Sequence, residues 1–231
     1  MIDSKYISLK TTIGLVTILW FIMSCGVQKE QTPFTGVLEY KITPRDSSNT
    51  ALAAKNSMFV YTNDTITRTE NFTGQLGKQV SIRHMEMDKS YLLLITDLGK
   101  FAIQTDHAKS DSTKRESQYN FKKKSLKKTI AGQKANKISV SHPNFKEPIE
   151  FLYLKEYANK YIAIYPEIPG LLVKYSIATE DGILDYELVK INEYSPNRDL
   201  FGIPSDFEKI SFDEFLDKMI AAKKEAQKPP Q

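Results

Sequence analysis

Cysteine is nearly absent from this sequence of 231 residues, which contains only Cys25. A single thiol excludes an intramolecular disulfide framework and a zinc site built from several cysteines. The sequence also has no large excess of charge of either sign, since it contains 32 Lys and Arg against 28 Asp and Glu. This balance is not that of a nucleic-acid-binding protein. A hydrophobic content of 41% with 26% charged residues is ordinary for a globular domain.

Signatures of common enzyme classes are missing as well. The sequence has no Gly-x-Ser-x-Gly elbow, phosphate loop, dinucleotide fingerprint or His-Glu-x-x-His motif. The histidines His84, His107 and His142 are isolated, and the His84-Met85-Glu86 segment has no third metal ligand nearby. We therefore expect no metal, no cofactor and no catalytic residues. An enzyme with a dispersed catalytic set stays open as a third alternative.

The first 24 residues are predicted to be a signal peptide. Lys5 and Lys10 precede an uncharged stretch, residues 11–24. As a helix this stretch would span about 21 Å, short of the roughly 30 Å hydrocarbon core. A positive start followed by a short apolar run is typical of secretory signals. No other apolar run is long enough for a transmembrane helix.

The end of that run, Ile22-Met23-Ser24-Cys25-Gly26, resembles a bacterial lipobox. The resemblance implies cleavage before Cys25, attachment of lipid to its thiol and a polar tether over residues 25–33. Two or three acyl chains anchor a protein stably in a membrane. A residue other than Asp after the Cys implies the outer membrane, facing either the periplasm or the cell surface. An uncleaved signal anchor and a buried Cys are the alternatives.

From Phe34 onward, apolar residues alternate with polar ones and turn residues recur, which predicts a single β-rich domain over 34–227 and a loose tail over 228–231. Loops are expected at 44–56 and 106–120. About eleven or twelve antiparallel strands favour a curved sheet or an unclosed barrel. The strands are predicted at 34–43, 57–62, 64–72, 78–87, 90–96, 100–105, 127–132, 135–142, 148–155, 160–165, 170–178 and 182–194.

One amphipathic helix is predicted near the C-terminus. Its apolar residues recur at helical spacing, and Ser211 with Glu214 forms a capping-box pattern at its start. We expect this helix to pack its apolar stripe on the sheet, with a stripe that binds a partner as the alternative. The stripe comprises Phe212, Phe215, Leu216, Met219 and Ile220.

Four segments together resemble the GLPGLI-type family of uncharacterised Gram-negative envelope lipoproteins. They are residues 34–40 (FTGVLEY), 129–134 (TIAGQK), 168–172 (IPGLL) and 201–207 (FGIPSDF). The resemblance implies a LolA/LolB-like fold, an unclosed antiparallel barrel with an apolar concave face. It brings no settled activity. From the residues alone, Gly36 and Gly132 are expected at bulges or bends and Pro169-Gly170 at a turn.

Several residues are candidates for contacts or modification. A lysine cluster, comprising Lys122, Lys123, Lys124, Lys127 and Lys128, either contacts anionic headgroups or forms a solvated, charged edge strand. Thr65 and Ser112 each follow an Asp in a pattern that some Gram-negative bacteria O-glycosylate. Five aromatic residues either line a ligand cavity or fill a core: Tyr40, Tyr91, Phe101, Tyr153 and Tyr175.

The sequence thus favours a membrane-anchored lipoprotein that binds an apolar ligand or lipid moiety on a concave sheet face. The alternative is a non-catalytic structural or interaction subunit of an envelope complex, which recruits an envelope protein through an open sheet edge.

Overall fold

The structure, a computed structural model, describes residues 31–45, 56–73, 77–106, 118–179 and 182–226. The predicted signal peptide, Cys25, Ser112, His107 and the C-terminal tail lie outside the described residues. These described residues lie together in one compact unit. No helix of the described residues is long and apolar enough to cross a membrane.

The described residues form one curved, unclosed sheet of twelve strands, in the order β12-β6-β5-β4-β3-β2-β1-β11-β10-β9-β8-β7. All neighbouring strands are antiparallel except β12 and β6. This confirms the predicted fold class. The strands are β1 (Thr35–Pro44), β2 (Ser57–Asn63), β3 (Ile66–Thr73), β4 (Gly77–His84), β5 (Lys89–Thr96), β6 (Gly99–Asp106), β7 (Asn120–Ile130), β8 (Gln133–Ser141), β9 (Ile149–Leu154), β10 (Leu171–Thr179), β11 (Gly182–Glu193) and β12 (Glu208–Ser211).

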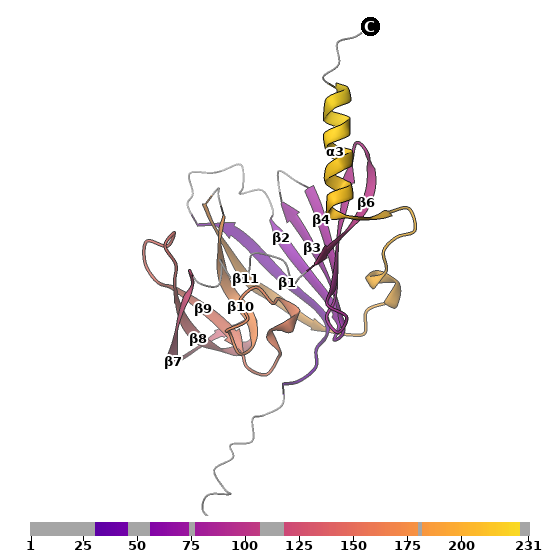
Figure 1. Ribbon diagram of the computed structural model, residues 1–231. Coiled ribbons are helices and arrows are strands. Elements are labelled where there is room, and N and C mark those ends of the chain that lie inside the picture. The colour runs from indigo at the N-terminus through magenta and orange to yellow at the C-terminus, as the bar shows by residue number, and fades with distance from the viewer. Residues whose placement is uncertain (1–30, 46–55, 74–76, 107–117, 180–181, 227–231) are drawn as a thin grey trace, which may run out of the picture. The chain divides into compact units, whose positions relative to one another are not determined.

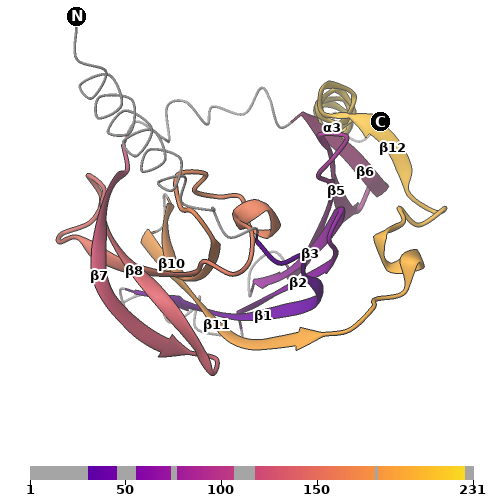
Figure 2. The ribbon, with the colours of Figure 1, turned by 90° about the horizontal axis from the view of Figure 1, so that it is seen from below.

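The sheet curves around the connection between β9 and β10, which contains the 3₁₀ helix η3 (Asn159–Tyr161) (Figure 2). The face toward this connection is here called the concave face. A large core cluster forms there, in which Tyr161, Tyr165 and Ile168 of the connection pack with Leu38 and Tyr40 of β1. The segment that carries the second 3₁₀ helix, η4 (Arg198–Phe201), packs on the opposite, convex face.

Two sequence predictions about strands are wrong. Residues 160–165 form η3 and a turn, because the chain folds back onto the concave face and Ala163 adopts a positive φ of 48°. Strand β7 begins at Asn120 rather than at 127 and includes the lysine-rich segment. It is the last strand of the sheet, and Lys122, Lys123 and Lys124 are consecutive and all exposed, so the alternation of apolar residues is weak there.

Two glycines of the segments that resemble the GLPGLI-type family lie where a side chain would clash with a neighbouring backbone. At Gly36, where φ is +146°, a Cβ would lie 2.1 Å from the carbonyl oxygen of Asn192 on the neighbouring β11. At Gly170 a Cβ would lie 2.2 Å from the carbonyl oxygen of Leu154. Both allow close approach of two strands. Gly132 was expected at a bulge or bend within a strand. It lies instead in the tight turn between β7 and β8.

The C-terminal helix α3 (Phe212–Ala226) follows β12 at the edge of the sheet (Figure 1). Its predicted capping box is present: the Ser211 backbone N–H donates to Glu214 Oε2 (2.7 Å) and the Glu214 N–H donates to Ser211 Oγ (3.2 Å). The prediction that the whole stripe packs on the sheet is wrong. Only Phe215 packs, against Phe101 of β6.

Four apolar side chains of α3 are exposed. Their exposed fractions are 53% for Phe212, 41% for Leu216, 42% for Met219 and 51% for Ile220. The helix contacts mainly β6 and β12, and it continues past this edge of the sheet, so its later turns have no sheet surface to cover (Figure 1). We call these four residues the α3 stripe.

Candidate functional site

The lysine cluster lies on β7, and all five lysines are exposed. The pairing of β7 with β8 divides them between the two faces. Lys122, Lys124 and Lys128 share one face, whereas the bulge between Lys124 and Lys127 places Lys123 and Lys127 on the other. The structure therefore does not bring the five charges to a single surface.

Thr65 lies in the turn between β2 and β3 and is exposed. Its hydroxyl donates to Asn63 Oδ1 (3.1 Å), and Asn63 Oδ1 also accepts from the N–H groups of Thr65 and Ile66. These bonds hold the turn as an Asx turn. The preceding residue, Asp64, has a structural role described below.

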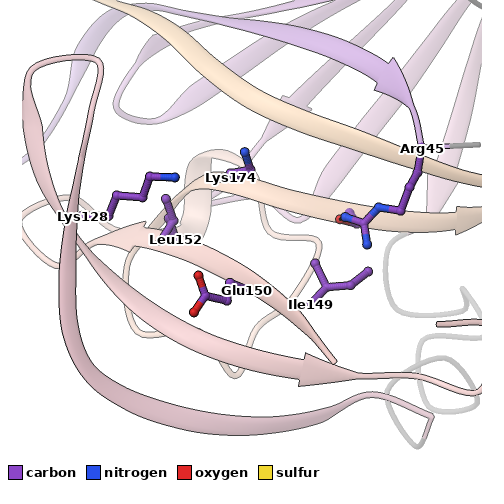
Figure 3. A pocket seen from close by; sticks show the side chains of 7 residues that line it. Arg45, Lys128, Ile149, Glu150, Leu152 and Lys174 are labelled. Carbon is purple, nitrogen blue, oxygen red and sulfur yellow. The ribbon is translucent and has the colours of Figure 1, made fainter. Parts of the chain in front are cut away.

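A first cavity, of about 250 Å³, lies beside β9 and β10. Figure 3 shows Lys128 and Arg45 approaching it from opposite sides, with Leu152 and Glu150 between them. Its charges are mostly paired. Arg45 binds Asp185 (2.6 Å), Lys174 binds Glu187 (2.5 Å) and Glu150 binds Lys137 (3.1 Å). The lining residues are Arg45, Lys128, Ile149, Glu150, Leu152, Lys174 and Ser176.

Five aromatic residues were predicted either to line a cavity or to fill a core, and most of them lie in the core. Tyr40, Tyr153 and Tyr175 are buried in the cluster on the concave face, and Phe101 is buried against α3. Tyr91 is half-buried and pairs with Ile82 on the convex face. The connection between β9 and β10 thus fills the concave face over β1 and β8–β11 with the protein's own side chains.

A second cavity, of about 270 Å³, lies where that connection meets the end of β4. Its lining residues are Arg83, His84, Met85, Asp88, Lys160 and Ala163. Residues 83–88 and 160–163 are more than 70 positions apart, so sequence reasoning had no signal for this site beyond His84. His84 faces this cavity, but no group of three metal-binding side chains occurs among the described residues.

A hydrogen-bond network fixes the wall that carries Lys160. Lys160 Nζ contacts Asp64 Oδ1 (2.8 Å) and donates to the Asp64 carbonyl oxygen (2.9 Å). The hydroxyl of Tyr161 donates to Asp64 Oδ1 and accepts from the Phe34 N–H (2.7 Å). Partial burial raises the pKa of Asp64, but the hydrogen bonds from Lys160 and Tyr161 outweigh it and keep this pKa below its usual value.

Arg83 is a partly buried cation that no ion pair or hydrogen bond joins to any described residue. It is half-buried, and this burial lowers the pKa of its guanidinium, opposed by the charge of Asp88. Asp88 lies too far away for an ion pair. A desolvated charge without a partner is unfavourable.

Arg83 lies in a row of polar side chains that crosses four strands of the concave face. Strand register aligns Thr62 of β2 with Thr67 of β3, Thr67 with Arg83 of β4, and Arg83 with Ser90 of β5. Thr62, Thr67 and Ser90 are buried, and the hydroxyl of Ser90 has no hydrogen-bond partner among the described residues. At this end the concave face therefore carries polar side chains beside the apolar ones.

Apolar side chains follow the polar row along the same face. Leu92 and Leu94 come two and four residues after Ser90 on β5, and they pair with Ile103 and Phe101 of β6. Phe101 contacts Phe215 at the start of α3 (ring centroids 5.5 Å apart). At about 3.3 Å per residue, Leu94 lies roughly 13 Å from Ser90. The face therefore changes from polar at Arg83 to apolar toward the α3 stripe.

No family model and no curated protein matches this chain. Among solved structures, it is similar to PNGF-II in two crystal forms. The C2 form has a TM-score of 0.46 and 15% identity over 81% of this chain and 32% of that one. The P21 form has a TM-score of 0.47 and 14% identity over 80% and 33%.

A further likeness is to MucB in complex with MucA(peri), with a TM-score of 0.41 and 12% identity over 74% of this chain and 54% of that one. The chain spans about a third of the length of PNGF-II and about half of that of MucB. At these values the likenesses identify no family.

Proposed function

We propose that this protein is a membrane-anchored envelope lipoprotein, lipidated at Cys25, that binds an amphiphilic or lipid-like molecule at the β4–β6 end of its concave face. The observation that carries the binding proposal is the exposed α3 stripe. It lies on the helix next to Phe215, which is partly buried with Leu94 against the buried Phe101 of the sheet. Exposed apolar residues gathered on one surface mark sites for ligands, membranes or partners.

The rest of the concave face is filled, which directs the ligand to this end. Tyr40 and Tyr175 are 0% and 1% exposed, so their rings have no surface left for a ligand. The lipobox-like segment and the GLPGLI-type resemblance support an envelope location and the outer membrane, with anchoring through Cys25. Neither speaks to the identity of the ligand.

Native mass spectrometry of the full chain, extracted from its membrane, tests both parts of the proposal. We expect a mass increase of two or three acyl chains at Cys25, abolished in Cys25→Ser, and a co-purifying amphiphile. Replacing Leu216 and Met219 of the stripe by Gln should remove the amphiphile without unfolding the protein, because both side chains are already more than 40% exposed. The control replaces the charged Lys223 and Lys224 of the same helix by Gln.

The second candidate is a non-catalytic interaction subunit, whose α3 stripe is covered by an envelope protein instead of a small molecule. The packed aromatic core favours it, since a rigid scaffold needs no cavity there. Crosslinking from α3 separates the two. A single protein crosslinked through α3, together with no co-purifying amphiphile, would replace the ligand proposal by this one.

A further inference from the structure

The cavity beside Arg83 has the features of a site for an anionic group. It has a volume of about 270 Å³ and lies between the end of β4 and the connection that carries η3. The guanidinium of Arg83, which lines the cavity, has no ion-pair or hydrogen-bond partner among the described residues. An arginine presents a rigid fork of donors that fits carboxylate and phosphate oxygens.

One carboxylate, that of Asp88, lines the cavity, but no nearby acidic side chain forms an ion pair with Arg83. Asp88 is exposed and not within ion-pair distance of Arg83. Asp64 is already bound by Lys160 and Tyr161, so its carboxylate is not free to turn toward Arg83. Lys160 in turn keeps Asp64 occupied while its own side chain remains 41% exposed at the cavity wall.

A second, independent feature is the buried hydroxyl of Ser90. This residue is 6% exposed, and its Oγ has no hydrogen-bond partner among the described residues. It stands directly opposite Arg83 in the pairing of β4 with β5. Ser90 does not line the cavity itself, and its buried hydroxyl is a spare donor on the strand next to the Arg83 guanidinium.

We propose that Arg83, with Ser90 beside it, binds the phosphate or carboxylate group of an anionic ligand in this cavity. The inference rests on the proposed function, because it assigns the polar end of the amphiphile whose apolar end lies toward Leu94 and α3. The same chemistry also fits a small free anion. The experiment is therefore designed to distinguish the two sources.

Isothermal titration of the full chain in phosphatidylcholine nanodiscs, with empty nanodiscs as the blank, compares three probes. They are dodecyl phosphate, inorganic phosphate and the uncharged dodecyl maltoside. We expect dodecyl phosphate to bind, and Arg83→Gln to weaken it at least tenfold. Lys146→Gln, which removes an exposed cation that lines neither cavity, should leave it unchanged. Binding of inorganic phosphate with the same dependence on Arg83 would identify a free anion as the ligand.

A thermal melt distinguishes this site from a merely structural arginine. Because Arg83 has no partner to lose, Arg83→Gln without ligand should melt at or above the temperature of the unsubstituted protein. Equal binding of dodecyl phosphate to both proteins, or no binding of either phosphate, would overturn the anion site. If dodecyl maltoside still binds in that case, the proposed amphiphile function stands and only the anion inference fails. If none of the three probes binds, both proposals fail.

Discussion

Two tyrosines in the concave core form a natural pair for a stability measurement. Tyr40 and Tyr175 are both buried, and their rings meet edge to face with centroids 6.1 Å apart. The Tyr40 hydroxyl donates to the Leu172 carbonyl oxygen (2.6 Å). The Tyr175 hydroxyl has no hydrogen-bond partner among the described residues. Burial raises the pKa of both phenols, so both hydroxyls stay protonated over the whole working pH range.

Replacing each by Phe should change stability in opposite directions. Tyr40→Phe removes a buried hydrogen bond and leaves the Leu172 carbonyl with one partner fewer, which costs about 1–2 kcal/mol. Tyr175→Phe removes a buried hydroxyl that gains nothing in the folded protein, and so should stabilise by about 0.5–2 kcal/mol. The two variants should therefore differ by about 1.5–4 kcal/mol. For a domain of this size that corresponds to a difference in Tm of about 3–16 °C.

Urea unfolding followed by far-ultraviolet circular dichroism measures both free energies of unfolding at one temperature. The m-values should agree among the three proteins, since the same surface is exposed on unfolding. A Tyr175→Phe protein that loses 1 kcal/mol or more would refute the reasoning, because it would show that this hydroxyl makes a hydrogen bond in the folded state.

Three further predictions concern other parts of the chain. The lowered pKa of Asp64 stabilises the fold above the pKa of an unfolded Asp, about 3.9, and this contribution is lost as the pH falls through the lower folded pKa. Asp64→Asn should therefore unfold more easily at pH 7 and lose less stability between pH 5 and 3, measured by urea titrations at each pH. Gly36→Ala should destabilise by more than about 2 kcal/mol, since its Cβ would clash with the Asn192 carbonyl. Replacing Lys122–Lys124 by Gln should weaken binding to phosphatidylglycerol vesicles in flotation assays if β7 contacts headgroups.

Each of these has a control within the chain. Asp206→Asn alters an exposed carboxylate that pairs with Lys100 and should change the acid profile less. Gly132→Ala meets no atom within 4 Å and should cost only about 1 kcal/mol for its positive φ. Vesicle binding that is the same with and without the three lysines would leave β7 as a solvated edge strand.

Alternation of apolar residues was sufficient to predict most strands and the curved sheet. It failed where exposed lysines interrupt the alternation, as at Lys122, Lys123 and Lys124 of β7, and where apolar residues follow one another without forming a strand, as in Tyr161-Ile162-Ala163-Ile164-Tyr165. There the side chains Tyr161 and Tyr165 are buried by folding back onto the sheet rather than by strand pairing.

For helix α3, the sequence predicts where the helix begins but not which surface covers its apolar stripe. Its start follows from local hydrogen bonds between Ser211 and Glu214, which the spacing of the two residues reveals. Its apolar stripe reveals a face but not what covers that face, because the covering surface is set by where β12 joins the sheet. The cavity at Arg83 was beyond prediction for the same reason, since its walls meet only through strand pairing and the return of the chain at Lys160.

The position of β1 in the middle of the sheet has a consequence for how the chain folds. One side of β1 pairs with β2, the next strand along the chain, whereas the other pairs with β11, so that Tyr40 meets Leu188. A growing chain can complete the meander from β1 to β6 while β11 has not yet been synthesised. During that interval the open edge of β1 is a template for pairing with other chains. Pairing of β1 with β11 joins residues far apart in the sequence, so we expect it to be the slow step of folding. A chaperone would be needed most in the period before this pairing forms.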